Sequence, residues 1–111
     1  MSDLVTKHCR PCEGGVEALG SAEVRRLLSG FPGWNVNDAG DEIRRTFQFK
    51  NYHEVMAFVN AVAWMAHREN HHPDLEVGFK KVVVRYSTHA IEGLSENDFI
   101  CAAKVDALLA G

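Results

Sequence analysis

Apolar residues recur at helical spacing in three stretches of the chain, and these predict three helices. The stretches run from Ser21 to a glycine- and proline-rich break at 29–34, from Asn51 to about His67, and from Ser95 to about Leu109. Ser21, Asn51 and Ser95 are candidate N-caps. Glu54 and Asp98 each stand three residues after a cap, in the position of a capping box. The middle helix has the longest apolar stripe and is the strongest of the three predictions.

Between these helices, apolar and polar residues alternate with the period of a strand. In "DEIRRTFQF", Ile43, Phe47 and Phe49 share one face with Arg45. After Pro73 a second alternating run leads almost at once into "KVVVRYS", and the short connection at 79–81 predicts a β-hairpin. Hairpin-connected strands between helices favour an α+β fold over a doubly wound parallel sheet.

The last predicted helix is apolar around most of its circumference. One face holds Cys101, Ala102, Val105, Leu108 and Leu109, and a second holds Ile100, Ala103 and Ala107. A helix of this kind is usually buried on two sides. One side would pack on the sheet of its own chain, and we expect the other to contact a partner subunit in a homo-oligomer.

Composition limits the classes of function. With 111 residues the chain is expected to form one domain at 21–111, preceded by an arm at 1–20 that contains three glycines and has no sustained periodicity. The net charge of -3 and the lack of a Lys/Arg run argue against direct nucleic-acid binding. No apolar stretch is long enough to span a membrane, and the N-terminus lacks the pattern of a signal peptide. We therefore expect a cytoplasmic protein.

The cysteines are three in number, Cys9, Cys12 and Cys101, which argues against a disulfide framework. Cys9 and Cys12 resemble half of a zinc site, with His8 adjacent, but the chain offers no second pair of ligands. We interpret them as free thiols on the arm, with metal binding or cross-linking between subunits as the alternatives. Cys101 is expected to be a small core residue.

Histidines gather where the middle helix gives way to the hairpin, in "HRENHHPDLEVGF". His67 and His71 are four residues apart, the spacing of one helical face. Pro73 disfavours helical geometry at His72, so we expect the helix to end near residue 70 and His71 and His72 to lie at a bend. His89 follows the second hairpin strand and could approach the pair. A polar helix end, a metal site and a general acid/base site all remain open on this evidence.

Read in order, these residues form a signature. It consists of His67-x-x-x-His71-His72-Pro73, then Phe79, His89 and Asp98, together with "FPGW", "STH" and "GLSENDF". This resembles the pterin-4a-carbinolamine dehydratases, small α+β proteins also known in animals as dimerisation cofactors of a homeodomain transcription factor. The likeness covers about residues 21 to 109. It implies an antiparallel four-stranded sheet with helices packed on one face, in the order α-β-β-α-β-β-α, and a homodimer or homotetramer.

The resemblance also implies a reaction. It is the dehydration of 4a-hydroxytetrahydrobiopterin to the quinonoid dihydropterin, which recycles the cofactor of aromatic amino-acid hydroxylases and needs no metal or other cofactor. His71, His72 and His89 would be the catalytic acid/base residues. The substrate-binding residues would be His67, Asn70, Ser87, Thr88, Asp98 and Trp34. Asp98 could orient a histidine, complete the capping box with Ser95, or do both, and Trp34 could line the pocket or belong to the core.

Two positions depart from the animal pattern. His67 stands where animal members have Glu, and Asn70 stands where they have Asp. Each change removes a carboxylate, so we expect activity to survive with an altered pH optimum. The alternatives are a non-enzymatic oligomeric interaction or regulatory module with a vestigial pterin site and, more weakly, a metal-binding protein.

Overall fold

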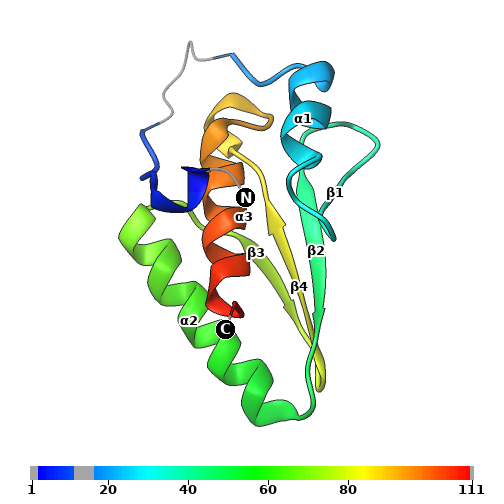
Figure 1. Cartoon of the computed structure of the whole chain (residues 1–111), viewed down its shortest axis with the longest axis vertical. Coiled ribbons are helices and arrows are strands. Elements are labelled where there is room, and N and C mark those ends of the chain that lie inside the picture. Colours follow the sequence, from blue (N-terminus) through cyan, green and yellow to red (C-terminus); the bar gives the residue numbers. More distant parts are fainter. Residues whose placement is uncertain (1–2, 12–16, 111) are drawn as a thin grey trace.

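The computed structural model describes residues 3–11 and 17–110, and its helices and strands follow the predicted order (Figure 1). They are α1 (Ser21–Leu28), β1 (Asn35–Val36), β2 (Ile43–Gln48), α2 (Tyr52–Glu69), β3 (Asp74–Val77), β4 (Lys81–Tyr86) and α3 (Glu96–Leu108). Two short 3-10 helices are added to these, η1 (Asp3–Thr6) and η2 (His89–Ile91). The predicted α+β class is confirmed.

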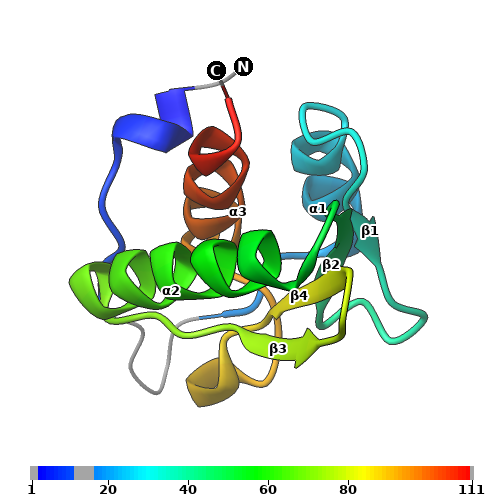
Figure 2. The same cartoon turned by 90° about the horizontal axis from the view of Figure 1, so that it is seen from below.

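The four strands form one antiparallel sheet in the order β1-β2-β4-β3. In β4, Val84 lies opposite Leu75 of β3, and Val82 lies opposite Phe47 of β2, so these apolar side chains share one face. All three α-helices lie on that side of the sheet (Figure 2). The other face carries residues such as Arg85, so the fold has two layers with one core between them. The prediction of a four-stranded sheet with helices on one face is confirmed.

Arg45 interrupts the apolar face of β2, and α3 accommodates it. Arg45 Nη1 donates to Asp106 Oδ1 at 2.9 Å, and the guanidinium lies 4.6 Å from the centroid of the Phe47 ring. Trp34 Nε1 donates to the same carboxylate at 3.0 Å. Burial raises the pKa of Asp106, although the hydrogen bonds and charge of these two donors act in the opposite direction. The carboxylate therefore ties the first two strands to the last helix.

Most, but not all, of the N-cap residues predicted from the sequence occupy that position in the structure. Asn51 caps α2, because its side chain accepts from Glu54 N at 2.9 Å as predicted. Ser21 is not the cap of α1: Gly20 holds that position and Ser21 is the first helical residue. Gly20 makes no side-chain cap, so α1 is held at this end by its backbone alone. Ser95 caps α3, as expected.

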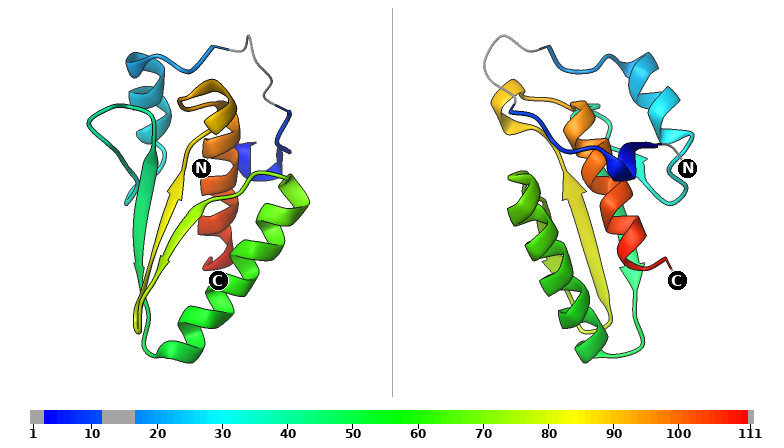
Figure 3. Two further views of the ribbon diagram at one scale, coloured as in Figure 1. Left: turned by 180° about the vertical axis from the view of Figure 1, so that it is seen from behind. Right: turned by 60° about the vertical axis from the view of Figure 1, so that its left-hand side comes forward.

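Residues 3–11, which we call the N-terminal strap, pass along α3 instead of projecting from the fold (Figure 3). Leu4 is only 6% exposed and belongs to the main apolar cluster. Lys104 Nζ of α3 donates to Val5 O at 2.8 Å. The expectation that this part of the arm stays out of the core is therefore wrong. The predicted features at Cys12, Gly14 and Gly15 lie outside the described residues.

α3 is buried within the single chain on more sides than one. It packs against η1, α2 and β4, and Ile100 and Ala103 are each 1% exposed. The sequence predicted two buried sides for this helix without saying which one meets a partner subunit, and the chain itself covers the side that holds Ile100 and Ala103. A homo-oligomer remains a prediction. Among the described residues, no helix combines the length and apolarity that a membrane crossing needs.

Candidate active site

The bend after α2 is made by Asn70. Its φ of 51° and ψ of 42° are left-handed, a conformation that asparagine tolerates better than most residues. The backbone N–H of His71 then donates back to Ala66 O at 3.2 Å, which closes the helix end. The side chains of His71 and His72 follow directly after this turn. The expected helix end near residue 70 is confirmed.

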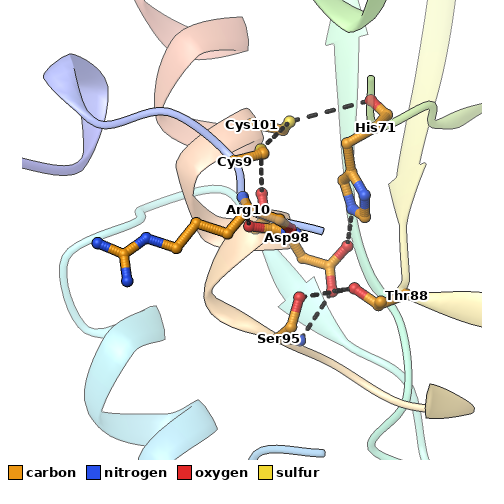
Figure 4. Close-up of polar contacts among 8 residues, drawn as sticks. Cys9, Arg10, His71, Thr88, Ser95, Asp98 and Cys101 are labelled. Carbon is orange, nitrogen blue, oxygen red and sulfur yellow. Dashed lines mark hydrogen bonds and ion pairs between the residues drawn. The ribbon is translucent and has the colours of Figure 1, made fainter. Parts of the chain in front are cut away.

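His71 is anchored by the carboxylate of Asp98 (Figure 4). His71 Nε2 lies 2.6 Å from Asp98 Oδ1, and the Asp98 side chain is completely buried. Asp98 Oδ2 accepts from Thr88 Oγ1 at 2.8 Å and from the backbone N–H of Ser95 at 3.0 Å. Asp98 thus makes both contacts that the sequence allowed for, one to a histidine and one to the N-cap of α3.

The ring of His71 is also fixed by packing. It stacks on Tyr86, with 5.6 Å between ring centroids and 7° between ring planes. Burial raises the pKa of Tyr86, as does the neighbouring Cys101, so the phenol stays neutral. With Nε2 donating to the Asp98 carboxylate, Nδ1 is the nitrogen of His71 that can accept a proton.

His71 borders a hollow of about 580 Å³, a volume that suits a small-molecule ligand. Three segments far apart in the sequence supply its walls. They are the end of α2 with the bend (Arg68, Glu69, Asn70, His71, His72), the segment after β4 (Ser87, Thr88, His89, Ala90), and the strap with one residue of α3 (Cys9, Arg10, Pro11, Asn97). The sheet topology makes this meeting possible because β4 ends beside the start of β3, where the bend lies.

Most of the predicted site residues come together here. Those on the hollow are His71, His72, His89, Asn70, Ser87 and Thr88, and Asp98 supports them from behind. The hydroxyl of Thr88 is engaged by Asp98 and by Ser95 Oγ at 2.7 Å, so this side chain supports the site from a buried position. His72 and His89 are exposed, in contrast to His71.

The structure separates Trp34 and His67 from this hollow. Trp34 is 4% exposed and packs edge-on against Phe47, so it is a core residue. His67 is exposed, and its ring lies against that of Trp64 with centroids 5.5 Å apart. The helical spacing of His67 and His71 does not bring them together because the left-handed turn at Asn70 redirects the chain between them. Neither residue borders the hollow, and of the two places that the sequence allowed for Trp34 the structure supports the core.

The strap contributes site residues that the sequence did not reveal. Cys9 N donates to Glu69 Oε1 at 2.8 Å, and Cys9 Sγ lies 3.5 Å from Cys101 Sγ. A hydrogen bond with Cys101 and burial raise the pKa of Cys9, so it stays a neutral thiol. Arg10 follows on the wall of the hollow. A Cys-x-x-Cys motif gives no sign of such packing, because the contacts depend on residues about 60 to 90 positions away.

Glu69 carries a negative charge at the edge of the site. Burial alone would raise its pKa, but hydrogen bonds from Cys9 N–H and His8 and the charge of Lys104 outweigh burial and lower it. His8 Nδ1 lies 2.9 Å and Lys104 Nζ 3.7 Å from Glu69 Oε2. Within residues 3–11 and 17–110, no three His, Cys, Asp or Glu side chains are placed to share a metal ion.

Comparison with known proteins agrees with this architecture. The family model described as pterin 4 alpha carbinolamine dehydratase matches residues 17–108. A protein of Nitrosospira multiformis named "Putative pterin-4-alpha-carbinolamine dehydratase" is 57% identical over 108 residues, which cover 97% of this chain and 94% of the relative. A protein of the same name from Xanthomonas campestris pv. campestris is 56% identical over 108 residues, covering 95% of this chain and 92% of the relative.

Solved structures show the same likeness. A crystal structure described as a transcriptional coactivator/pterin dehydratase from Brucella melitensis superposes with a TM-score of 0.80 at 30% identity, covering 86% of this chain and all of that one. A pterin dehydratase-like protein identified as a RuBisCO assembly factor in the alpha-carboxysome has a TM-score of 0.63 at 23% identity, over 73% of this chain and 94% of that one, and shares the fold. The chain belongs to the pterin 4 alpha carbinolamine dehydratase family.

Proposed function

We propose that this protein dehydrates 4a-hydroxytetrahydropterins, such as 4a-hydroxytetrahydrobiopterin, to the quinonoid dihydropterin by histidine acid/base catalysis. The observation that carries the proposal is the arrangement of His71, His72 and His89 around one hollow, with His71 fixed by Asp98. Family membership and the names of the relatives support the same reaction.

The reaction needs two proton transfers at neighbouring atoms. The bond between C4a and its hydroxyl oxygen breaks, the N5–H proton is removed, and a C4a=N5 double bond forms as water leaves. His71 suits the acceptor role because Nε2 faces Asp98 and Nδ1 makes no hydrogen bond to a described residue. His72 and His89 are exposed on the hollow and suit the donor role at the departing hydroxyl. Each such transfer typically contributes about 10²–10⁴-fold.

The test compares dehydration of a generated 4a-hydroxytetrahydropterin by the wild type and by His72→Ala, followed as formation of the quinonoid product. We expect turnover to fall by more than about tenfold, because one proton-transfer group is lost. The matched control is His53→Ala, an exposed histidine near the start of α2 that does not border the hollow. A His72→Ala protein with the wild-type unfolding temperature and wild-type turnover would show that the assignment is wrong.

In the cell the reaction would follow an aromatic amino-acid hydroxylase, which produces the 4a-hydroxypterin, and would return the cofactor to its reducible form. We further infer a cytoplasmic homo-oligomer, a dimer or tetramer. Its support is the apolar surface left on the single chain, where Trp64 is 63% and Leu109 50% exposed.

A second candidate is a non-enzymatic interaction module. The description of the Brucella melitensis structure as a transcriptional coactivator/pterin dehydratase favours keeping it. The two functions differ in whether they require His72. Binding to a protein partner would survive the loss of His72, whereas dehydration would not, so the same variant separates them.

A further inference from the structure

The strap is held against the hollow by side chains whose hydrogen bonds are aimed at its backbone. Asn97 Oδ1 accepts from Arg10 N at 3.0 Å, and Asn97 Nδ2 donates to Arg10 O at 2.6 Å. One amide side chain therefore pairs with both polar groups of one residue, as a neighbouring strand would. Because Asn97 is only 6% exposed, a donor or acceptor left unpaired there would be costly. Asn97, at the start of α3, thus fixes the backbone position of Arg10.

Glu69 holds the preceding residue in the same way. Its Oε1 accepts from Cys9 N at 2.8 Å, while its Oε2 faces His8 and Lys104. The negative charge of Glu69 is therefore already balanced by groups outside the ligand space. The Glu69 carboxylate therefore contributes little negative potential to the hollow that it borders.

The remaining formal charges on the hollow are positive. Arg10 and Arg68 both line it, and neither makes an ion pair with any residue in 3–11 or 17–110. The protein as a whole has a net charge of -3, so two guanidinium groups beside one cavity, with no ion-pair partner among the described residues, give this place a positive charge that the protein as a whole lacks. Guanidinium groups bind phosphate and carboxylate through paired N–H donors.

The direction of Arg10 indicates which part of a ligand it can meet. Figure 4 shows its side chain extended away from His71, on the other side of Cys9. This direction leads away from the atoms that would react at His71 and toward a substituent that leaves the histidine cluster on the strap side. On the other side of Ser87–His89, a second hollow of about 440 Å³ contains Asp41, Glu42 and Glu92, which would repel an anion.

From these observations we propose that the site is selective for pterins whose side chain carries an anionic group, phosphate or carboxylate, and that Arg10 and Arg68 bind that group. The strap, through Asn97 and Glu69, then acts as the specificity wall of the pocket. This inference rests on the proposed dehydratase function and names the substrate class of the same site.

The test measures kcat/KM for three 4a-hydroxy substrates, made from 6-methyltetrahydropterin, tetrahydroneopterin phosphate and tetrahydropterin-6-carboxylate. The quantity compared is the ratio of kcat/KM for each anionic substrate to that for the neutral one. In Arg10→Gln or Arg68→Gln we expect either ratio to fall by about threefold to fivefold, the effect of losing a partly exposed charge pair. In the double variant the fall should be about tenfold or more. Comparing the phosphate substrate with the carboxylate substrate shows which anion Arg10 and Arg68 prefer.

The matched control is Arg25→Gln, which removes one exposed positive charge from α1, far from the hollow, and should leave both ratios unchanged. Raising the ionic strength should lower the ratios in the wild type and have a much smaller effect in the double variant. Ratios that do not change in the Arg10→Gln, Arg68→Gln double variant would overturn the inference and leave the dehydratase assignment standing. If the wild type turns over none of the three substrates, both the dehydratase assignment and this inference are wrong.

Discussion

The carboxylate of Asp98 is completely buried, yet both of its oxygen atoms have donors. One accepts from His71, and the other accepts from Thr88 and from the N-cap residue of α3. A buried charge is tolerated when its hydrogen bonds are satisfied, and here the same bonds fix the orientation of the His71 ring. His71 and the start of α3 are therefore held by one residue.

Replacing this carboxylate by an amide tests its role in catalysis. In Asp98→Asn we expect kcat to fall by about 10–100-fold, because His71 loses the partner that fixes its proton on Nε2. KM should change much less, since Asp98 does not line the hollow. Steady-state kinetics over a range of pH would measure both. Thr88→Val, which removes only one donor to Asp98, should cause a smaller loss of kcat. If KM instead rises by as large a factor as kcat falls, the substitution has disrupted the pocket in general.

At the scale of single residues, the three histidines named from the sequence do border one hollow, but helical spacing placed a fourth histidine with them incorrectly. His71, His72 and His89 could be named because their order matches a family signature. The helical spacing of His67 and His71 suggested that His67 belongs with them, but a single left-handed residue at position 70 breaks the periodicity on which that spacing depends. Spacing predicts proximity only while the helix continues.

At the scale of elements, the strap is stabilised by its hydrogen bonds to Glu69 of α2. The low pKa of Glu69 means that its folded-state contribution is present above its unfolded pKa, near 4.5, and is lost as the pH falls through the folded value. We expect Glu69→Gln to lower the free energy of unfolding at pH 7 by about 1–2 kcal/mol. The difference from the wild type should shrink as the pH falls from about 4.5 through the lower folded pKa of Glu69, because the carboxylate is then protonated first in the unfolded and finally in the folded protein.

Denaturant unfolding of the two proteins across this pH range would measure the effect. Glu17→Gln removes an exposed carboxylate and provides the control for the change in net charge. A difference between Glu69→Gln and the wild type that persists unchanged in acid would show that the lost stability does not come from ionised Glu69.

The elements also show which parts of a fold local sequence can reveal. Both ends of α2 and the β3–β4 hairpin depend on residues within a few positions of one another, and they were predicted correctly. The strap has no periodicity of its own. Its position depends on Asn97 and Glu69, which contact its backbone and so leave no pattern in its side chains. These segments are far apart in the sequence, so only the three-dimensional structure shows that they are in contact.

At the scale of the whole molecule, an apolar region is exposed beside the hydrophobic core. It lies where α2 and α3 meet and includes Ala61, Trp64, Met65, Ala107 and Leu108, which border a hollow of about 400 Å³. Trp64 is 63% and Leu108 40% exposed. Exposed apolar surface of this kind commonly marks a protein interface. The chain itself covers the side of α3 that holds Ile100 and Ala103, so this exposed region is the better candidate for a contact with a partner subunit.

We therefore expect the wild type to be a homo-oligomer in solution and Trp64→Lys to lower its mass, because a charge would replace the largest exposed apolar side chain of this region. Light scattering at micromolar concentration would measure the mass. Phe79→Lys is the matched control: Phe79 is 70% exposed, but it stacks on Tyr52 at the hairpin, away from the junction of α2 and α3. Dissociation by Phe79→Lys alone would place the interface at the hairpin instead. A monomeric wild type would contradict the prediction altogether, and the exposed tryptophan would then need a different partner.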